Sequence, residues 1–303
     1  MAFSYTTYRF GQLLALTLPL PWSYWIAERI ADLQYALRSA DRRAILGNVS
    51  AIVDDPFSAR RLAREIFRNF GKYLVDFLRF PRVDAAFIAR RVRVEGLEHL
   101  RDTLSRYGGA ISVTAHLGNW ELAGAVTAQA GFPVAAVALN HRDARVNHFF
   151  NVQRRSKGVV GIPPGLALRH CHRFLAQHRV VALLGDRNYT SRGVACTFLS
   201  RRVMIPRGPA LLSVRTGTPI VPGFLLRASH AQRYVLYFEP PLLPPSTGDR
   251  EQDIHTLTQR YVAVIERYVK AHPAQWFLFR PFDVPEIADT AKPQTSATTR
   301  KNQ

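Results

Sequence analysis

Between residues 109 and 239 the chain repeats a short apolar run followed by a longer amphipathic stretch. The apolar runs are GAISVTA (109–115), PVAAVAL (133–139), VVALLG (180–185), PIVPGFLL (219–226) and YVLYFE (234–239). Runs of this length, rich in Val, Ile and Leu, are typical of buried strands. Helix-like stretches lie among them at 119–130, 143–155 and 165–177. Because strands that alternate with helices form parallel sheets, the pattern predicts an α/β fold: a layered core with a largely parallel sheet flanked by helices.

Before Pro81 the periodicity is helical, with Ile26, Ile30 and Leu33 on one face. We therefore expect a helical N-terminal region over residues 1–80, followed by the α/β core over 81–286. Residues 287–303 are polar, rich in Thr and without periodicity, which predicts a disordered tail.

Residues 10–27, FGQLLALTLPLPWSYWIA, carry no charge. The run is slightly shorter than the roughly 20 residues that a membrane-spanning helix needs, and Pro19 and Pro21 would interrupt a straight helix. Trp and Tyr favour the interface of a membrane. We interpret the run as a membrane-seating segment, spanning or not; a buried helix is the alternative, and a cleaved signal peptide fits less well.

The chain is strongly basic, with 41 Lys and Arg against 22 Asp and Glu in 303 residues, a net charge of +19. This charge favours anionic membranes, phosphorylated substrates or an acidic partner protein. A nucleic-acid-binding or anionic-surface-binding protein is an alternative from another class. The arginines are spread along the chain, and the aromatic and basic motifs of RNA-binding domains are missing, so we expect no nucleic acid partner.

Cys171 and Cys196 are the two cysteines, and their spacing suggests reduced thiols rather than a disulfide framework. His170 and His172 flank Cys171 on a helix-like stretch, but residues two apart on a helix do not share a face. The sequence therefore predicts no metal site.

His116 falls at the end of the first apolar run, and Glu121 falls in the first turns of the helix after it. Active sites of α/β sheets lie at the carboxyl ends of the strands. A carboxylate that accepts one ring N–H of a His fixes its tautomer and raises its basicity. The spacing suggests a general-base dyad for removing a proton from a hydroxyl; a buried His beside a helix-capping Glu is the alternative.

The residues around His116 and Glu121 resemble the motif of a known family. HLGNWEL (116–122) resembles the His-x4-Asp/Glu motif of the lysophospholipid acyltransferase superfamily, in the form seen in the late acyltransferases of bacterial lipid A biosynthesis. Further similar stretches are QRRSKGVVGIPP (153–164), HRVVALLGDRN (178–188), the segment 196–224 and QWFLFRPF (275–282). The resemblance covers roughly residues 95–282.

By this resemblance, His116 deprotonates an acceptor hydroxyl and Glu121 orients the His. The donor is the fatty acyl thioester of acyl carrier protein or coenzyme A, the acceptor is a glycolipid such as a lipid A precursor in lipopolysaccharide biosynthesis, and no cofactor is needed. The implied location is the cytoplasmic face of a bacterial inner membrane. Another lipid acceptor and a thioesterase that uses the same dyad on water are the nearest alternatives.

Further residues are candidates for substrate binding. Asp186 and Arg187 follow the third apolar run, where Arg187 could hold a phosphate or a developing oxyanion; an Asp–Arg turn is the structural alternative. Arg201 and Arg202 precede a Gly-Pro helix start and would add positive charge; a solvated basic loop is the alternative. Asn119, inside the His-x4-Glu motif, completes the set.

Overall fold

The computed structural model of the protein describes residues 4–163, 167–189, 193–228 and 233–283. The tail over 287–303, predicted to be disordered, lies outside the described residues.

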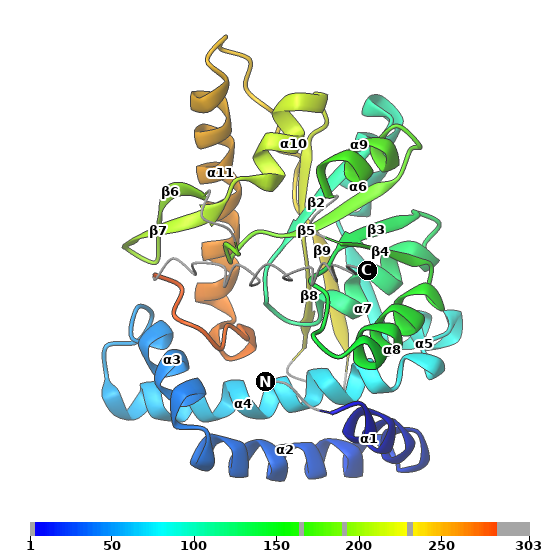
Figure 1. Ribbon diagram of the computed structural model, residues 1–303, viewed down its shortest axis with the longest axis vertical. Coiled ribbons are helices and arrows are strands. Elements are labelled where there is room, and N and C mark those ends of the chain that lie inside the picture. The colour runs from blue at the N-terminus through cyan, green and yellow to red at the C-terminus, as the bar shows by residue number, and fades with distance from the viewer. Residues whose placement is uncertain (1–3, 164–166, 190–192, 229–232, 284–303) are drawn as a thin grey trace, which may run out of the picture.

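A seven-stranded sheet forms the centre of the molecule (Figure 1). The strands lie in the order β1-β9-β8-β2-β5-β3-β4. Neighbours are parallel except β8 and β9, which are antiparallel, so the prediction of a largely parallel sheet is confirmed. The strands are β1 (Val92–Glu95), β2 (Ala110–Thr114), β3 (Val134–Val137), β4 (Val159–Ile162), β5 (Val180–Leu184), β8 (Ile220–Arg227) and β9 (Tyr234–Phe238).

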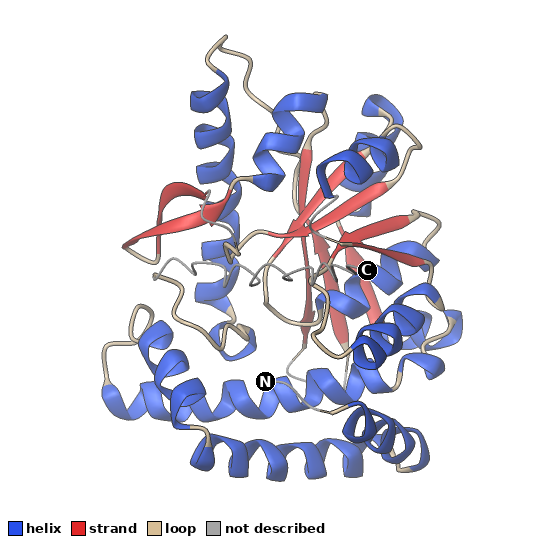
Figure 2. Cartoon of the chain, viewed as in Figure 1, coloured by secondary structure: helices blue, strands red, loops and turns tan. Residues whose placement is uncertain are grey.

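Helices cover both faces of the sheet (Figure 2). One face packs against α9 (Ala167–Leu175), α10 (Gly208–Thr216) and α11 (Arg250–Ala271). The other face packs against α6 (Leu97–Tyr107), α7 (Trp120–Gln129), α8 (Ala144–Arg155) and the end of α4 (Pro56–Leu78). The alternation of side chains along each strand gives each face its own apolar core. The architecture is therefore three-layered, as the alternating sequence pattern predicts.

The five apolar runs became β2, β3, β5, β8 and β9, and the three helix-like stretches became α7, α8 and α9. An antiparallel hairpin of β6 (Gly193–Phe198) and β7 (Arg201–Pro206) was not predicted, because its segment mixes apolar and basic residues without a clean period of two. The hairpin packs on α11 beside the sheet (Figure 1).

The uncharged run at the N-terminus is divided between two helices, α1 (Tyr5–Thr17) and α2 (Leu20–Leu37). Pro19 caps α2 and Pro21 lies in its first turn, where the missing N–H costs no helical hydrogen bond. Of the helices in the described part of the chain, none has both the length and the apolar character that a membrane span requires.

Helix α2 runs alongside α4, with α1 near one end and α3 (Ser39–Val49) near the other (Figure 1). The short α5 (Ala85–Arg91) leads from this helical group into β1. The strong apolar face of α4 is buried between α2 and the sheet layer. This packing places Asp76 of α4 between Tyr24 of α2 and Asn119, which ends the loop after β2.

Candidate active site

His116 and Asp186 meet at the carboxyl edge of the sheet. Strands β2 and β5 are parallel neighbours in which Thr114 is paired with Leu184. Each of the two residues follows its strand by two positions, so the register alone places them side by side. The ring Nδ1 of His116 lies 2.8 Å from Oδ1 of Asp186, and the backbone N–H of His116 donates to Oδ2 at 2.9 Å.

The carboxylate of Asp186 has a third partner. The indole Nε1 of Trp276 donates to Oδ2 at 3.1 Å, and the Asp186 side chain has no exposed surface. Burial raises the pKa of this carboxyl, but the contacts with His116 and Trp276 outweigh burial, so the pKa lies below its usual value. An ionised Asp186 accepts the proton of Nδ1, which leaves Nε2 of His116 as the basic nitrogen.

The open side of the His116 ring faces the cavity. Nε2 lies 3.3 Å from the hydroxyl of Tyr189, and Trp120 packs edge to face against the ring with 5.3 Å between centroids. The His116 side chain is 13% exposed. A small molecule that enters the cavity can therefore reach Nε2.

Glu121 does not occupy the place that the sequence analysis gave it. In the described residues, its carboxylate is held by Arg154 of α8, with Nε donating to Oε2 at 2.9 Å, and both side chains are nearly buried. Burial lowers the pKa of Arg154, but the charge and hydrogen bonds of Glu121 raise it further than burial lowers it. The residue that orients His116 is Asp186, because the partner comes from the neighbouring strand and not from the helix that follows.

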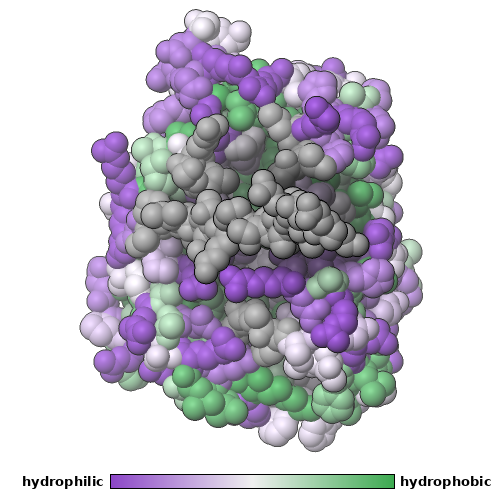
Figure 3. Space-filling view, in the orientation of Figure 1, coloured by the Kyte–Doolittle hydropathy of each residue, from purple (hydrophilic) through white to green (hydrophobic). Residues whose placement is uncertain are grey.

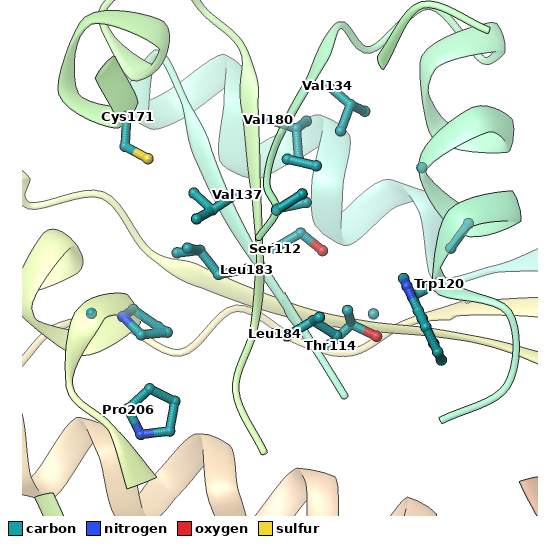
Figure 4. A pocket seen from close by; sticks show the side chains of 18 of the residues that line it. Ser112, Thr114, Trp120, Val134, Val137, Cys171, Val180, Leu183, Leu184 and Pro206 are labelled. Atoms are coloured by element: carbon teal, nitrogen blue, oxygen red, sulfur yellow. The ribbon is translucent and has the colours of Figure 1, made fainter. Parts of the chain in front are cut away.

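A cavity of about 780 Å³ opens beside His116. Its walls are mostly apolar, and they come from both faces of the sheet (Figure 4): Leu183 and Cys171 lie on one side of β5, and Val180 and Ser112 on the other. The part on the α7 side reaches from Leu184 to Val180, which at about 3.3 Å per residue is ~13 Å along the strand. Besides His116, the polar lining residues are Ser112, Thr114, Glu121, Thr127, Arg154, Arg187, Asn188, Tyr189 and Arg207.

The comparisons with known proteins agree with one another. The family model described as bacterial lipid A biosynthesis acyltransferase matches residues 4–282. The chain belongs to that family.

A phosphatidylinositol mannoside acyltransferase of Mycobacterium tuberculosis (strain CDC 1551 / Oshkosh) is 27% identical over 257 residues, which are 82% of this chain and 77% of that protein. The protein with the same name in Mycolicibacterium smegmatis is 26% identical over 265 residues, 86% of this chain and 85% of that protein. The protein described here is thus an acyltransferase, as the resemblance implied, and its relatives are named for a glycolipid.

Asn119 has a structural place in this acyltransferase. Its Oδ1 accepts from the backbone N–H of Leu122 at 2.9 Å and so caps α7, and its Nδ2 donates to Asp76 of α4. It is buried and is not among the described residues that line the large cavity. A role of Asn119 in substrate binding stays a prediction.

The four other candidates for substrate binding separate into two groups. Arg187 lines the cavity and stacks over the ring of Tyr189, whereas Asp186 lies behind His116. Arg201 and Arg202 lie on β7 and are not among the described lining residues. Arg201 forms an ion pair with Asp283 on the surface. The two arginines therefore belong to the surface of the hairpin and not to the described wall of the cavity.

Four residues around the site were not predicted from the sequence: Arg154, Tyr189, Arg207 and Trp276. Arg154 lies in the last turn of α8, 33 residues from Glu121, and no short motif joins them. Trp276 lies within the stretch 275–282 that carried part of the resemblance, which is the one signal that marked its region. Its role on Asp186 depends on a contact across 90 residues of sequence.

Gly118 explains part of the motif. Its φ is +64°, and a Cβ at this position would lie 2.0 Å from the backbone oxygen of Leu225. Only Gly fits the turn between His116 and Asn119, because the backbone needs both the left-handed conformation and the close approach to β8.

Proposed function

We propose that the protein transfers a fatty acyl chain from a thioester to a hydroxyl of a glycolipid, with His116 as the general base and Asp186 as the residue that holds it. The observation that carries the proposal is the contact of Asp186 with Nδ1 of His116 at the mouth of a long apolar cavity. An apolar channel beside a basic nitrogen suits a substrate with an aliphatic chain and a reactive carbonyl at its end.

In this reaction Nε2 of His116 removes the proton of the acceptor hydroxyl as its oxygen attacks the thioester carbonyl. The carbonyl carbon becomes tetrahedral, and its oxygen carries the negative charge, which Arg187 at the cavity wall stabilises. The C–S bond then breaks, the thiolate takes the proton from the imidazolium, and the ester and the free thiol leave. Asp186 stabilises the imidazolium between the two proton transfers.

The fatty chain occupies the cavity on the α7 side of the sheet. Small residues there, Ala182 and Gly124, leave room between the strand and the helix, and Val180 lies toward the far end. The acyl chain thereby displaces water from the apolar walls, which contributes to the binding free energy of the donor.

The donor is acyl carrier protein or acyl-coenzyme A, both of which are anionic. A net charge of +19 attracts either over long range, and this attraction is screened over about 8 Å at physiological salt. Salt should therefore raise KM for an acyl carrier protein donor and change kcat little. A KM that does not depend on salt would contradict the electrostatic contribution.

The acceptor is a glycolipid in the plane of a membrane. Mannosylated phosphatidylinositol is the acceptor class that the relatives' names favour; a lipid A precursor, as in lipopolysaccharide biosynthesis, is the class that the family's description favours. The enzyme would act at the cytoplasmic face of the inner membrane, where acyl thioesters are made.

Helices α1 and α2 provide the surface for that membrane. Trp22 is 61% exposed and Trp25 is 55% exposed on α2, and Phe10 and Leu13 are similarly exposed on α1. Hydrophobic residues gather at this lower end of the molecule (Figure 3). An aromatic and aliphatic face of this kind inserts into the interface of a bilayer without spanning it.

The membrane proposal is tested by sedimentation with vesicles of phosphatidylethanolamine and phosphatidylglycerol. Trp22→Ser combined with Trp25→Ser should lower the bound fraction. Tyr107→Ser, which removes an exposed aromatic residue from α6, is the matched control. Equal binding of the double variant and the wild type would contradict the assignment of this surface.

The reaction is tested with the purified full chain, a long-chain acyl-coenzyme A or acyl carrier protein, and either acceptor in detergent, with the product detected by mass spectrometry. His116→Ala should lower kcat by about 10²–10⁴-fold, the range for general-base catalysis. His148→Ala, which changes an exposed His of α8, should leave it unchanged. Full activity of His116→Ala, or hydrolysis of the thioester without transfer to either acceptor, would overturn the proposed function.

A further inference from the structure

A second cluster of buried polar groups lies against the loop that carries His116. Its centre is the carboxylate of Asp76, in the last turn of α4 and 8% exposed. Asp76 accepts a hydrogen bond from the hydroxyl of Tyr24 at 2.6 Å and from Nη2 of Arg227 at 2.5 Å. Nδ2 of Asn119 donates to the same carboxylate at 3.3 Å. Side chains from α2, β8 and the start of α7 therefore all donate hydrogen bonds to one carboxylate.

The loop from His116 to Asn119 is held by this cluster and by the segment next to it. The backbone N–H of Asn119 donates to the carbonyl of Leu225 on β8, and that of Gly118 donates to the carbonyl of Gln275. The Gln275 amide in turn bonds both the N–H and the carbonyl of Arg227, each at 2.9 Å. A shift of Arg227 would therefore move both carbonyls that hold the loop, those of Leu225 and Gln275.

The cluster is costly unless it is complete. Arg227 and Asp76 are an ion pair with little exposed side-chain surface, and a buried ion pair gives little net stability compared with apolar residues of the same size. Burial raises the pKa of Tyr24, and the charge of Asp76 raises it further, so the hydroxyl stays protonated and donates. The arrangement gives all three side chains hydrogen-bond partners, and a satisfied buried network of this kind holds rigidly the segments that it joins.

We propose that Asp76 is a positioning residue for catalysis: by holding Asn119 against Arg227 and Tyr24, it sets where α7 begins and thereby where the His116 ring stands relative to the bound thioester. The inference rests on the proposed function of His116. It extends that function to side chains that contact neither the large cavity nor the pair of His116 and Asp186. Tyr24 belongs to the same device and links it to α2, whose Trp22 and Trp25 lie on the outside of that helix.

The test measures kcat and KM for the acyl donor in three variants of the full chain. Asp76→Asn keeps the shape of the side chain but removes the charge that Arg227 and Asn119 share. Tyr24→Phe removes one hydroxyl and is the milder change. Asp253→Asn is the matched control, because Asp253 is a buried carboxylate of α11 that accepts hydrogen bonds from Thr247 and has no part in the proposed device.

We expect Asp76→Asn to lower kcat by about 10- to 100-fold, since a displacement of about 1 Å at a catalytic group has effects of this size. KM for the donor should stay near the wild-type value, because the cavity is untouched. Tyr24→Phe should lower kcat less, in the same pattern. Asp253→Asn should lower the melting temperature and leave kcat unchanged.

A double-mutant cycle separates positioning from general loss of stability. If Asp76 acts through Asn119, Asp76→Asn and Asn119→Ala have effects on ln kcat that do not add, because the second change removes a contact that is already lost. Additive effects would overturn the inference. So would wild-type kcat in Tyr24→Phe together with wild-type kcat in Asp76→Asn.

Failure of the inference is distinguishable from failure of the proposed function. An inactive His116→Ala beside fully active Asp76→Asn and Tyr24→Phe removes the positioning role alone. A fully active His116→Ala removes the general base itself. Where Asp76→Asn does not fold, the cycle is run with Tyr24→Phe and Asn119→Ala, for which the same rule of non-additivity applies.

Discussion

Replacing Asp186 by Asn keeps the size of the side chain but changes which nitrogen of His116 carries the proton. In the wild-type protein, Oδ2 of Asp186 accepts two hydrogen bonds, from the backbone N–H of His116 and from Nε1 of Trp276. Oδ1 faces Nδ1 of the ring at 2.8 Å. An Asn side chain has one carbonyl oxygen and one NH2 group, so it cannot serve both positions as acceptor.

The two orientations of the amide differ in free energy. In the first orientation, the NH2 group of the Asn side chain points toward the backbone N–H of His116 and the indole N–H of Trp276, so neither of these two buried donors has an acceptor. Each unsatisfied donor costs about 1–3 kcal/mol, or about 2–6 kcal/mol for the two together. With its oxygen there instead, the NH2 faces Nδ1 of His116, which must then accept. The proton moves to Nε2, and the nitrogen that faces the cavity is no longer a base.

Asp186→Asn should therefore lower kcat by about 10²–10⁴-fold, the whole contribution of a general base, although the His is still present. KM for the acyl donor should change little, since Asp186 does not line the cavity. The assay is single-turnover acyl transfer followed by mass spectrometry, with Asp253→Asn as the control. Activity close to that of the wild type in a folded Asp186→Asn protein would refute the assignment of the orienting residue.

Two further substitutions and one pH dependence test the site. Glu121→Gln leaves the charge of Arg154 buried without its partner and should lower the free energy of unfolding by about 3–5 kcal/mol in denaturant titrations, whereas replacing both residues by Leu should cost less; equal losses would contradict the pairing. Ala182→Phe fills the cavity on the α7 side and should shift the preference toward shorter acyl chains when donors compete, and unchanged selectivity would place the chain elsewhere. The pKa of Asp186 is lowered in the folded state, so the stability that its ionised form contributes is fully present above the unfolded pKa of about 3.9 and is lost as pH falls through the folded pKa. The difference in unfolding free energy between wild type and Asp186→Asn, measured by urea unfolding, should therefore shrink at acidic pH. A difference that does not depend on pH would contradict the lowered pKa.

Five of the seven strands, β2, β3, β5, β8 and β9, could be predicted because their signal is local, whereas β1 and β4 were not among the apolar runs. Each run, such as the one that became β5, is apolar over a few residues, and flanking polar residues mark its ends. The hairpin of β6 and β7 could not be recognised in this way, since Arg201 and Arg202 interrupt the pattern at the turn. The N-terminal run breaks between α1 and α2 at Leu18 and Pro19, as predicted for Pro19, whereas Pro21 lies in the first turn of α2 and does not interrupt it.

The partner of His116 was predicted wrongly for the opposite reason. Glu121 is near in sequence, five residues after the His, but α7 directs it to Arg154 of α8. Asp186 is 70 residues away and becomes a neighbour through the register of β2 and β5. His116 and Asp186 were each identified as candidates from their positions after apolar runs. A single sequence does not give the strand order, which places β5 next to β2.

Three buried carboxylates surround the start of α7, and each binds a cationic or protonated group from a different element. Asp186 after β5 holds His116, Glu121 holds Arg154 of α8, and Asp76 of α4 holds Arg227 of β8. An uncompensated buried charge is far more costly than a satisfied one, so a small displacement of any of these elements is resisted more strongly than apolar packing alone would resist it. The consequence is that the geometry around His116 is fixed by contacts between segments far apart in the sequence, while the apolar walls that receive the acyl chain are free to vary in size. Variation in the wall residues should therefore alter which chain is transferred, whereas variation in the three pairs should alter whether transfer occurs.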